Sequence, residues 1–183
     1  MKFSIELPVQ FRDIDVMGHV NNATYLQYME TARVEHARSL GQVREGLRAS
    51  FIVASVRCEF KKPIRDERRI SVWVWVSRIG DRSWNLDYSI RGPKRVEYAV
   101  DRTTQVAYDY KTRSAVQISG KLRRKLAKHV EAPLKFRETA LSAESIAYEK
   151  LGPRFGYGQQ QVWYITMVML AGCWKLPPVE IGG

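Results

Sequence analysis

The sequence predicts an α+β fold in which a five-stranded antiparallel sheet wraps around one long central helix. Three observations predict it. An alternating segment opens the chain, a long segment with helical spacing follows, and four more alternating segments separated by turn signals come next. A strand, one helix and then a run of antiparallel strands describe a sheet that curls around a single helix.

The central helix is predicted over residues 22–40. Residues at spacings of three and four form one core-facing side of it: Tyr25, Tyr28, Met29, Ala32 and His36. Asn21 and Asn22 are good capping residues for its start, and Gly41 suits a left-handed position at its end. We expect a loop at residues 44–49.

The strands are defined by period-two alternation. The first lies within residues 1–11, and the others are expected at residues 51–60, 69–77, 84–90 and about 96–110. Turn signals lie between them at residues 63–67, 80–83 and 92–94, which favours short antiparallel connections. A short basic helix at residues 121–129 is expected to close the unit.

The strand at residues 84–90 shows the clearest alternation. Its apolar residues face one way, and three polar residues face the other: Asn85, Asp87 and Ser89. Such a pattern is typical of a half-buried antiparallel strand, so we expect the polar face to be wet.

The strand at residues 69–77 has two apolar faces. Ile70 and three valines lie on one face, while Trp73 and Trp75 lie on the other. Both faces are therefore expected to be buried, and we expect the tryptophan face to meet another subunit.

Length and composition indicate one main domain with an appendage. At 183 residues, with 45% hydrophobic and 27% charged residues, the chain is typical of a folded protein. We predict a main domain over residues 1–132 and a C-terminal extension of unknown role over residues 133–183. In the extension, residues 142–150 are expected to form a short helix. The apolar residues 162–174 are expected to pack on the domain or across a subunit boundary.

No membrane span or secretion signal is expected. The longest apolar run, residues 162–172, is well short of the roughly 20 residues that cross a bilayer, and the alternating start lacks a continuous apolar stretch. Cys58 and Cys173 are far apart and have no second cysteine pair, so neither a disulfide framework nor a metal site is indicated. We expect a reducing, cytoplasmic compartment.

The formal net charge of +11 predicts an anionic partner. The excess lies in residues 1–132, which hold 25 Lys and Arg against 15 Asp and Glu. Nucleic acid, a membrane surface, an acidic carrier protein and the phosphates of coenzyme A would all be attracted, and charge alone does not choose among them.

The most informative stretch is residues 10–25, QFRDIDVMGHVNNATY, in which a strand ends in a loop and enters the long helix. Together with METAR at residues 29–33, the Lys62-Pro63 turn, GDRS at residues 80–83 and VAYD at residues 106–109, it resembles the 4-hydroxybenzoyl-CoA thioesterase family of hotdog enzymes. The HVNN version resembles members that act on longer acyl chains. The resemblance covers roughly residues 3–130 and implies the hotdog fold, an acyl-CoA or acyl-carrier-protein thioester as substrate, and a homodimer, with a tetramer of two dimers as the alternative.

The resemblance implies that Asp15 is the catalytic carboxylate, because the family's acid lies three residues before the glycine, here Gly18. It also implies that the main-chain amide of Asn22 polarises the thioester carbonyl. The chemistry is reasonable on physical grounds: hydrolysis needs a nucleophile or base and a positive field at the oxyanion, and a helix start supplies that field through its unpaired N–H groups. Gly18 would let the loop pass close to the substrate. Direct attack by Asp15 and activation of water stay open.

Other residues are candidates of lesser weight. His19 can be a base or a loop support, with support ranked first, and Tyr25 can line an acyl pocket or belong to the core. Glu30 is expected to pair with Arg33 three residues on. Basic residues that could bind the nucleotide phosphates of coenzyme A, or simply form a solvated surface, follow the later strands: Arg82 with Ser83 beside it, Lys111, Arg113, Arg123 and Arg124.

The sequence leaves two alternative functions. A basic nucleic-acid-binding module would explain the charge, but the aromatic residues lie in strands at core-like spacing and no recognised nucleic-acid motif is present. A hotdog dehydratase or hydratase would set Asp and His five positions apart with a proline between, whereas Asp15 and His19 are four apart with a glycine between. We therefore expect a thioester hydrolase with no cofactor other than coenzyme A as part of the substrate, and no nucleic-acid partner.

Overall fold

The computed structural model describes residues 2–43, 50–136 and 167–168. Its strands and helices follow in the order β1 (Phe3–Pro8), η1 (Phe11–Asp13), α1 (Asn22–Ser39), β2 (Phe51–Phe60), β3 (Arg69–Ile79), β4 (Ser83–Arg91), η2 (Pro93–Arg95), β5 (Glu97–Asp109), β6 (Ser114–Ala115), α2 (Gly120–Ala127) and β7 (Met167–Val168). The predicted strand, helix and four-strand order is confirmed. The two-residue strands β6 and β7 are additions to it.

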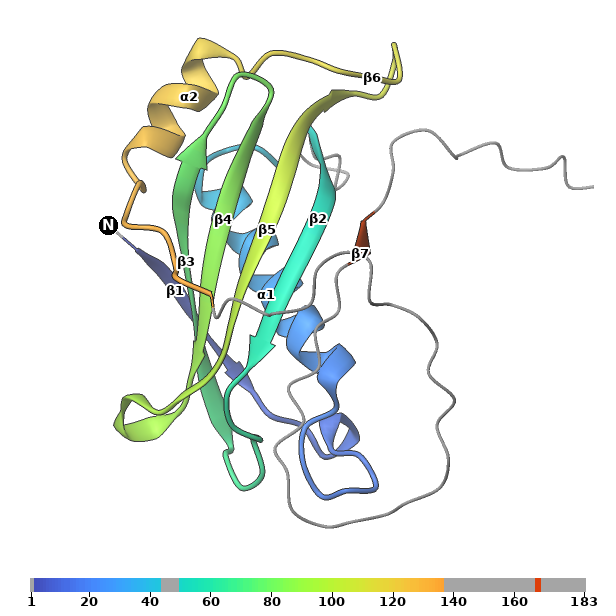
Figure 1. Ribbon diagram of the computed structural model, residues 1–183, viewed down its shortest axis with the longest axis vertical. Coiled ribbons are helices and arrows are strands. Elements are labelled where there is room, and N and C mark those ends of the chain that lie inside the picture. Colours follow the sequence, from blue (N-terminus) through green and yellow to red (C-terminus); the bar gives the residue numbers. More distant parts are fainter. Residues whose placement is uncertain (1, 44–49, 137–166, 169–183) are drawn as a thin grey trace, which may run out of the picture.

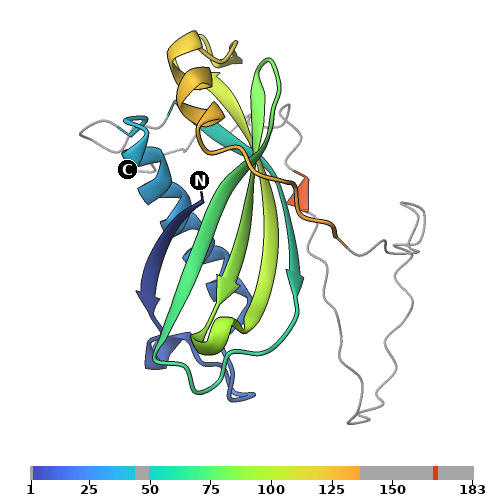
Figure 2. The same cartoon turned by 90° about the vertical axis from the view of Figure 1, so that its left-hand side faces the viewer.

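The five main strands form one antiparallel sheet in the order β1-β3-β4-β5-β2, with β7 beyond β2 and β6 paired to β5. Figures 1 and 2 show this sheet curling around α1, while α2 lies at the far end of the sheet from the start of α1. The β2–β3 connection must cross the sheet, because β2 is at one side and β3 lies next to β1. The connection that makes this crossing is hydrogen-bonded to the loop that precedes α1.

The core lies between α1 and the concave face of the sheet. The predicted helix face is buried, with exposed fractions between 0% and 7%, at Tyr25, Tyr28, Met29, Ala32 and His36. It packs on the inward residues of β3 and β4, such as Val74 and Tyr88, which are fully buried. Each large apolar side chain buried in this way contributes about 1.5–3 kcal/mol. The helix is therefore held to the sheet along its length.

The ends of α1 agree with the predicted capping. Asn21 is the N-cap, and its side-chain oxygen accepts a hydrogen bond from the Ala23 amide at 2.9 Å. Asn22 is already the first helical residue. At the other end Gly41 has φ +63°, the left-handed conformation that glycine adopts without steric cost.

The outer face of β4 corrects one expectation. Asp87 and Ser89 were expected to be wet, but both are 0% exposed. The Asp87 carboxylate accepts hydrogen bonds from Ser77 Oγ, from the Arg102 guanidinium and from the Leu134 amide, each at 2.7 Å. The segment after α2 crosses this face (Figure 1), so polar residues that alternate like surface residues are buried in a hydrogen-bonded network.

The tryptophan face of β3 is covered in part by the same segment. Trp75 is 2% exposed, its indole N–H donates to the Ala132 carbonyl at 3.0 Å, and the Lys2 ammonium lies 3.9 Å above its ring centroid. Its burial therefore needs no second subunit. Trp73 is half-buried, and the prediction that it meets another copy stays a prediction.

The C-terminal predictions fall mostly outside the described residues. The basic helix appears as α2, capped by Ser119, and residues 133–136 continue along the sheet. The expected loop at residues 44–49 and helix at residues 142–150 lie outside the described residues. So does the apolar segment at residues 162–174, apart from Met167 and Val168, which pair with β2. Among the described helices, none has the length and apolar character to span a membrane.

Candidate active site at the start of the central helix

The loop between β1 and α1 is a tight turn closed by main-chain hydrogen bonds. Asp15 donates its amide to the His19 carbonyl at 2.9 Å and accepts from the Gly18 amide at 3.0 Å, while Ile14 and Val20 form an antiparallel bridge. Gly18 has φ +74°, which a residue with a side chain rarely adopts. The backbone conformation of the turn therefore favours glycine at this position.

The Asp15 carboxylate lies within this turn and keeps partial access to solvent. Its Oδ1 accepts a hydrogen bond from the Met17 amide at 2.8 Å, and its side chain is 14% exposed. The Nδ1 atom of His19 is 3.6 Å from Asp15 Oδ2 and 3.4 Å from the Val20 carbonyl. A separation of 3.6 Å is longer than a hydrogen bond, so His19 is a close neighbour of the carboxylate and not its bonded partner.

The first turn of α1 leaves one amide available. The Asn21 amide donates to the Asp13 carbonyl, the Ala23 amide to the Asn21 side chain and the Thr24 amide to the Asn21 carbonyl, at 2.8–2.9 Å. Within the described part of the chain, the Asn22 amide has no acceptor. Unpaired N–H groups at a helix start carry partial positive charge, so this amide can bind a carbonyl oxygen or an oxyanion.

Asp13, the other acid of the loop, is built into the scaffold. It is 8% exposed, and its Oδ2 accepts hydrogen bonds from the Gln10 amide at 2.8 Å and the Tyr28 hydroxyl at 2.7 Å. Burial and the Asp13 carboxylate raise the pKa of Tyr28, so the phenol stays protonated as a donor. This bond ties the loop to α1, and the core-like position of Tyr28 is its only sign in the sequence.

Tyr25 also supports the loop. It is 2% exposed, its ring packs edge-on against Phe60, and its hydroxyl donates to the Lys62 carbonyl at 3.4 Å and accepts from the Ile64 amide at 3.1 Å. Burial raises its pKa to about 12. We therefore correct its predicted assignment from substrate contact to support of the site, because its side chain offers no accessible surface.

Three apolar side chains beside Asp15 are strongly exposed, and sequence analysis missed them. Phe11 is 96% exposed, Val16 105% and Met17 68%. Such exposure of large apolar residues in one loop is typical of a contact surface. The signal in the sequence was the presence of these residues in a loop that is otherwise polar.

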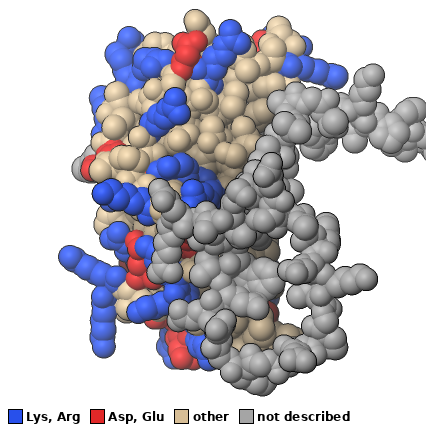
Figure 3. Space-filling model, viewed as in Figure 1, with Lys and Arg blue, Asp and Glu red and all other residues tan. Residues whose placement is uncertain are grey.

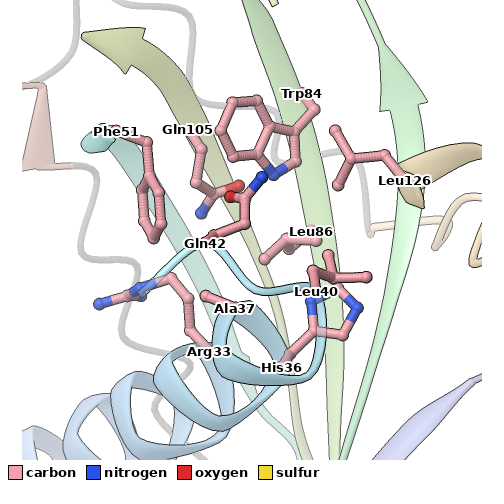
Figure 4. A pocket seen from close by; sticks show the side chains of 10 residues that line it. All are labelled: Arg33, His36, Ala37, Leu40, Gln42, Phe51, Trp84, Leu86, Gln105 and Leu126. Carbon is pink, nitrogen blue, oxygen red and sulfur yellow. The ribbon is translucent and has the colours of Figure 1, made fainter. Parts of the chain in front are cut away.

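A small cavity lies elsewhere, between the second half of α1 and the sheet (Figure 4). Its volume is about 210 Å³, part of it open to solvent, and its walls include Arg33, His36, Trp84 and Gln105. His36 follows Asn22 by 14 residues, which is about 21 Å along a helix. This cavity is therefore separate from the Asp15 loop. No group of three or more potential metal ligands occurs among the residues that the structure describes.

Residues 9–126 match the model of the thioesterase-like superfamily. The chain belongs to this superfamily. Its class of reaction is thioester hydrolysis, which confirms the sequence-based prediction of a hotdog-fold thioester hydrolase.

Individual relatives agree with the family. The chain is 27% identical over 130 residues to the long-chain acyl-CoA thioesterase FadM of Escherichia coli, covering 69% of this chain and 98% of FadM. It is 28% identical over 86 residues to the uncharacterized protein YsmA of Bacillus subtilis, and that match covers 47% of this chain and 58% of YsmA. A predicted thioesterase from Bacillus stearothermophilus has the same fold, with 22% identity, a TM-score of 0.68, and coverage of 73% of this chain and 99% of that one.

The thioesterase fold separates the remaining predicted site residues from Asp15. Arg82 and Ser83 lie at the start of β4, and Arg113 lies in the turn between β5 and β6, at the same end of the sheet as α2. Asp15 lies beyond the other end of the sheet, where Pro8 of β1 pairs with Arg69 of β3. The nine residues of β4 alone span about 26 Å. Within one chain, therefore, these three residues do not join Asp15 in a site.

Glu30 and Arg33 form the expected contact on α1. The Arg33 guanidinium is 3.7 Å from the Glu30 carboxylate, and the Glu30 side chain is 65% exposed. The Arg33 side chain is only 13% exposed, so the pair joins a solvent-exposed acid to a largely buried guanidinium. Glu30 lies two turns along the helix from the Asp15 loop.

Proposed function

We propose that this thioesterase hydrolyses an acyl-CoA, or an acyl group on a carrier protein, with Asp15 as the reactive carboxylate and the Asn22 amide as the oxyanion donor. The observation that carries the proposal is the free Asn22 amide in the same loop-to-helix junction as the partly accessible Asp15 carboxylate. The named activity of FadM supports coenzyme A as the carrier.

In the general-base route, Asp15 takes a proton from a water molecule while the oxygen of that water bonds to the carbonyl carbon. The carbonyl oxygen becomes an oxyanion, which accepts a hydrogen bond from the Asn22 amide. The carbon–sulfur bond then breaks, and the proton moves to the thiolate, so the products are a free acid and a free thiol. In the nucleophilic route, Asp15 attacks the carbonyl carbon, the carbon–sulfur bond breaks and the thiolate leaves. Water then hydrolyses the mixed anhydride to the free acid and the Asp15 carboxylate, and the released proton goes to the thiolate.

His19 has a supporting role in the proposal. When protonated, it would stabilise the Asp15 carboxylate at 3.6 Å through charge. When neutral, it could help to orient the substrate or the attacking water. Gly18 keeps side chains away from the approach to both residues.

We also propose that the enzyme works as a homodimer, or as a tetramer of two such dimers, with a second copy covering the exposed loop residues Phe11, Val16 and Met17. A second copy could bring its Arg82, Ser83 and Arg113 end to this loop, which one chain alone does not do. Cys58 is a buried free thiol, which is compatible with a cytoplasmic enzyme of lipid metabolism that uses no cofactor apart from the coenzyme A of its substrate.

The test is free-thiol release from a panel of acyl-CoA substrates by the wild type and Asp15→Asn. General-base or nucleophilic catalysis of this kind contributes about 10²–10⁴-fold, so Asp15→Asn should lose that much kcat and keep the wild-type melting temperature. Glu35→Gln, at an acid on the second half of α1 whose side chain is 41% exposed, is the matched control and should keep its activity. Unchanged turnover in Asp15→Asn would refute the assignment.

A further inference from the structure

We propose that two basic turns at the same end of the sheet as the Asp15 loop form a phosphate-binding surface that recognises the phosphorylated end of the thiol carrier. The surface consists of Arg65 in the β2–β3 connection and of Lys94 and Arg95 in the β4–β5 turn, and we call it the turn platform. The proposal rests on the proposed function, because it names how the same site holds the carrier of its thioester. It assigns phosphate recognition to residues other than the sequence-predicted Arg82 and Arg113.

The turn platform has a local excess of positive charge. Residues 61–69 hold five Lys and Arg against two acids, and Lys94 and Arg95 add two more cations. Some neighbouring cations are already neutralised: Lys61 pairs with Glu97, and Arg69 lies 3.7 Å from Glu6. Arg65, Lys94 and Arg95 are exposed and have no ion pair within the described residues. Lys and Arg side chains project from this lower end of the molecule in Figure 3.

The β2–β3 connection is bonded directly to the catalytic loop. The Val20 amide, one residue after His19, donates to the Ile64 carbonyl at 2.9 Å. The Ile64 amide in turn donates to the Tyr25 hydroxyl at 3.1 Å, and Ile64 is 0% exposed. Arg65 therefore directly follows Ile64, whose main chain is hydrogen-bonded to the segment that carries Asp15 and Asn22.

The two turns are also held to each other. The Tyr98 carbonyl accepts hydrogen bonds from the Lys61 amide at 2.7 Å and the Lys62 amide at 3.1 Å, and the Tyr98 hydroxyl donates to Glu67. A Cβ atom on Gly92 would lie 2.5 Å from the Tyr98 ring, so the β4–β5 turn packs tightly on this residue. The basic residues of both turns therefore belong to segments that are hydrogen-bonded to each other.

The β4–β5 turn keeps its cations at an energetic cost. Lys94 has φ +55° and Arg95 has φ +59°, so two consecutive residues with side chains adopt the left-handed conformation. Each such residue costs on the order of 1–2 kcal/mol, which glycine or asparagine would reduce. Strain that the surrounding structure maintains is most common where residues bind ligands. Here the strained residues are both basic, exposed and at the same end of the sheet as Asp15 (Figures 1 and 2).

The chemistry of the platform suits phosphate groups. A guanidinium can bind phosphate oxygens through two parallel hydrogen bonds, and a lysine ammonium contributes a point charge. In coenzyme A, and in the phosphopantetheine of a carrier protein, a flexible arm separates the thioester sulfur from the phosphates. The phosphates can therefore bind at the length of this arm from the junction that holds the carbonyl, and the turn platform lies at the same end of the sheet as that junction.

The test compares two variants that each lose three positive charges. The platform variant carries Arg65→Gln, Lys94→Gln and Arg95→Gln, and the control variant carries exposed substitutions away from it, Arg78→Gln, Lys121→Gln and Lys135→Gln. Both are assayed with one acyl group carried by coenzyme A, by 4′-phosphopantetheine and by N-acetylcysteamine, which has no phosphate. We expect the platform variant to raise KM for the acyl-CoA at least tenfold at unchanged kcat, and to leave N-acetylcysteamine thioester hydrolysis unchanged. That unchanged activity also shows that the variant is folded.

A matching rise in KM with 4′-phosphopantetheine would assign the platform to the phosphate next to the arm, which carrier proteins share. A rise with acyl-CoA alone would assign it to the nucleotide phosphates. An unchanged KM for acyl-CoA, or an equal rise in the control variant, would overturn the proposal. Calorimetry measures the affinity of both variants for free coenzyme A without turnover. The platform assignment is therefore tested independently of the Asp15 assignment, and either one can fail while the other stands.

Discussion

The bond between Tyr28 and Asp13 predicts how strongly the catalytic loop is tied to the central helix. Tyr28→Phe removes one hydroxyl and leaves the ring in place, so it opens no cavity of consequence. The lost bond is a 2.7 Å contact between a buried phenol and a carboxylate that keeps only the Gln10 amide as a donor to its Oδ2 among the described residues. Hydrogen bonds to charged groups contribute about 1.5–3 kcal/mol. We expect a loss of about 2 kcal/mol in the free energy of unfolding.

Urea unfolding followed by tryptophan fluorescence measures this loss, which corresponds to about a 30-fold fall in the ratio of folded to unfolded protein. Tyr110→Phe is the matched control, because Tyr110 is 59% exposed and its hydroxyl makes only a 3.4 Å contact with the Phe51 carbonyl. That control should change stability by less than about 0.5 kcal/mol. If Tyr28→Phe were as stable as Tyr110→Phe, the role of Asp13 as an anchor would be wrong.

Three further predictions concern other parts of the molecule. Asp87→Asn should cost about 3 kcal/mol of unfolding free energy in urea, because it leaves the Arg102 guanidinium without its buried anion; a loss below 1 kcal/mol would contradict this. Burial, with a smaller effect of His129, lowers the pKa of His36 to about 4, so its stabilising effect is complete above pH 6.5 and is lost as the pH falls from 6.5 to 4. A His36→Phe variant should therefore have a flatter stability profile over that window, and parallel profiles would argue against the effect. Gly18→Ala should lower kcat more than Gly18→Asn, because asparagine tolerates the left-handed φ of +74° better and no atom crowds the position; equal kcat values for the two variants would show that the turn conformation does not matter.

The sequence predicted most of the fold because the alternation of residues is a local signal. The helix at residues 22–40 and the strand at residues 51–60 agree with α1 and β2 to within one residue. The inward residues of β4 were also correct. The outer face was wrong at Asp87 and Ser89, because whether a polar face is wet depends on what crosses it. That covering segment follows α2, far away in the sequence.

The site was predictable only as far as one continuous motif extends. Residues 10–25 place Asp15, His19 and Asn22 in a single loop-to-helix junction, so their proximity follows from the sequence itself. The neighbourhood of Arg65 and Lys94 does not, because it depends on β2 and β3 being separated by two other strands in the sheet. Likewise, the distance of Arg82 from Asp15 follows from strand direction, which a list of basic residues does not contain.

The most direct measurement is the rate of thioester cleavage in a single turnover by Asp15→Asn beside Asp13→Asn, each at a temperature where it is folded. We expect Asp15→Asn to melt like the wild type and to cleave about 10²–10⁴-fold more slowly, and Asp13→Asn to melt earlier and to cleave at close to the wild-type rate. A folded Asp15→Asn protein with wild-type cleavage, next to a folded but inactive Asp13→Asn protein, would contradict it.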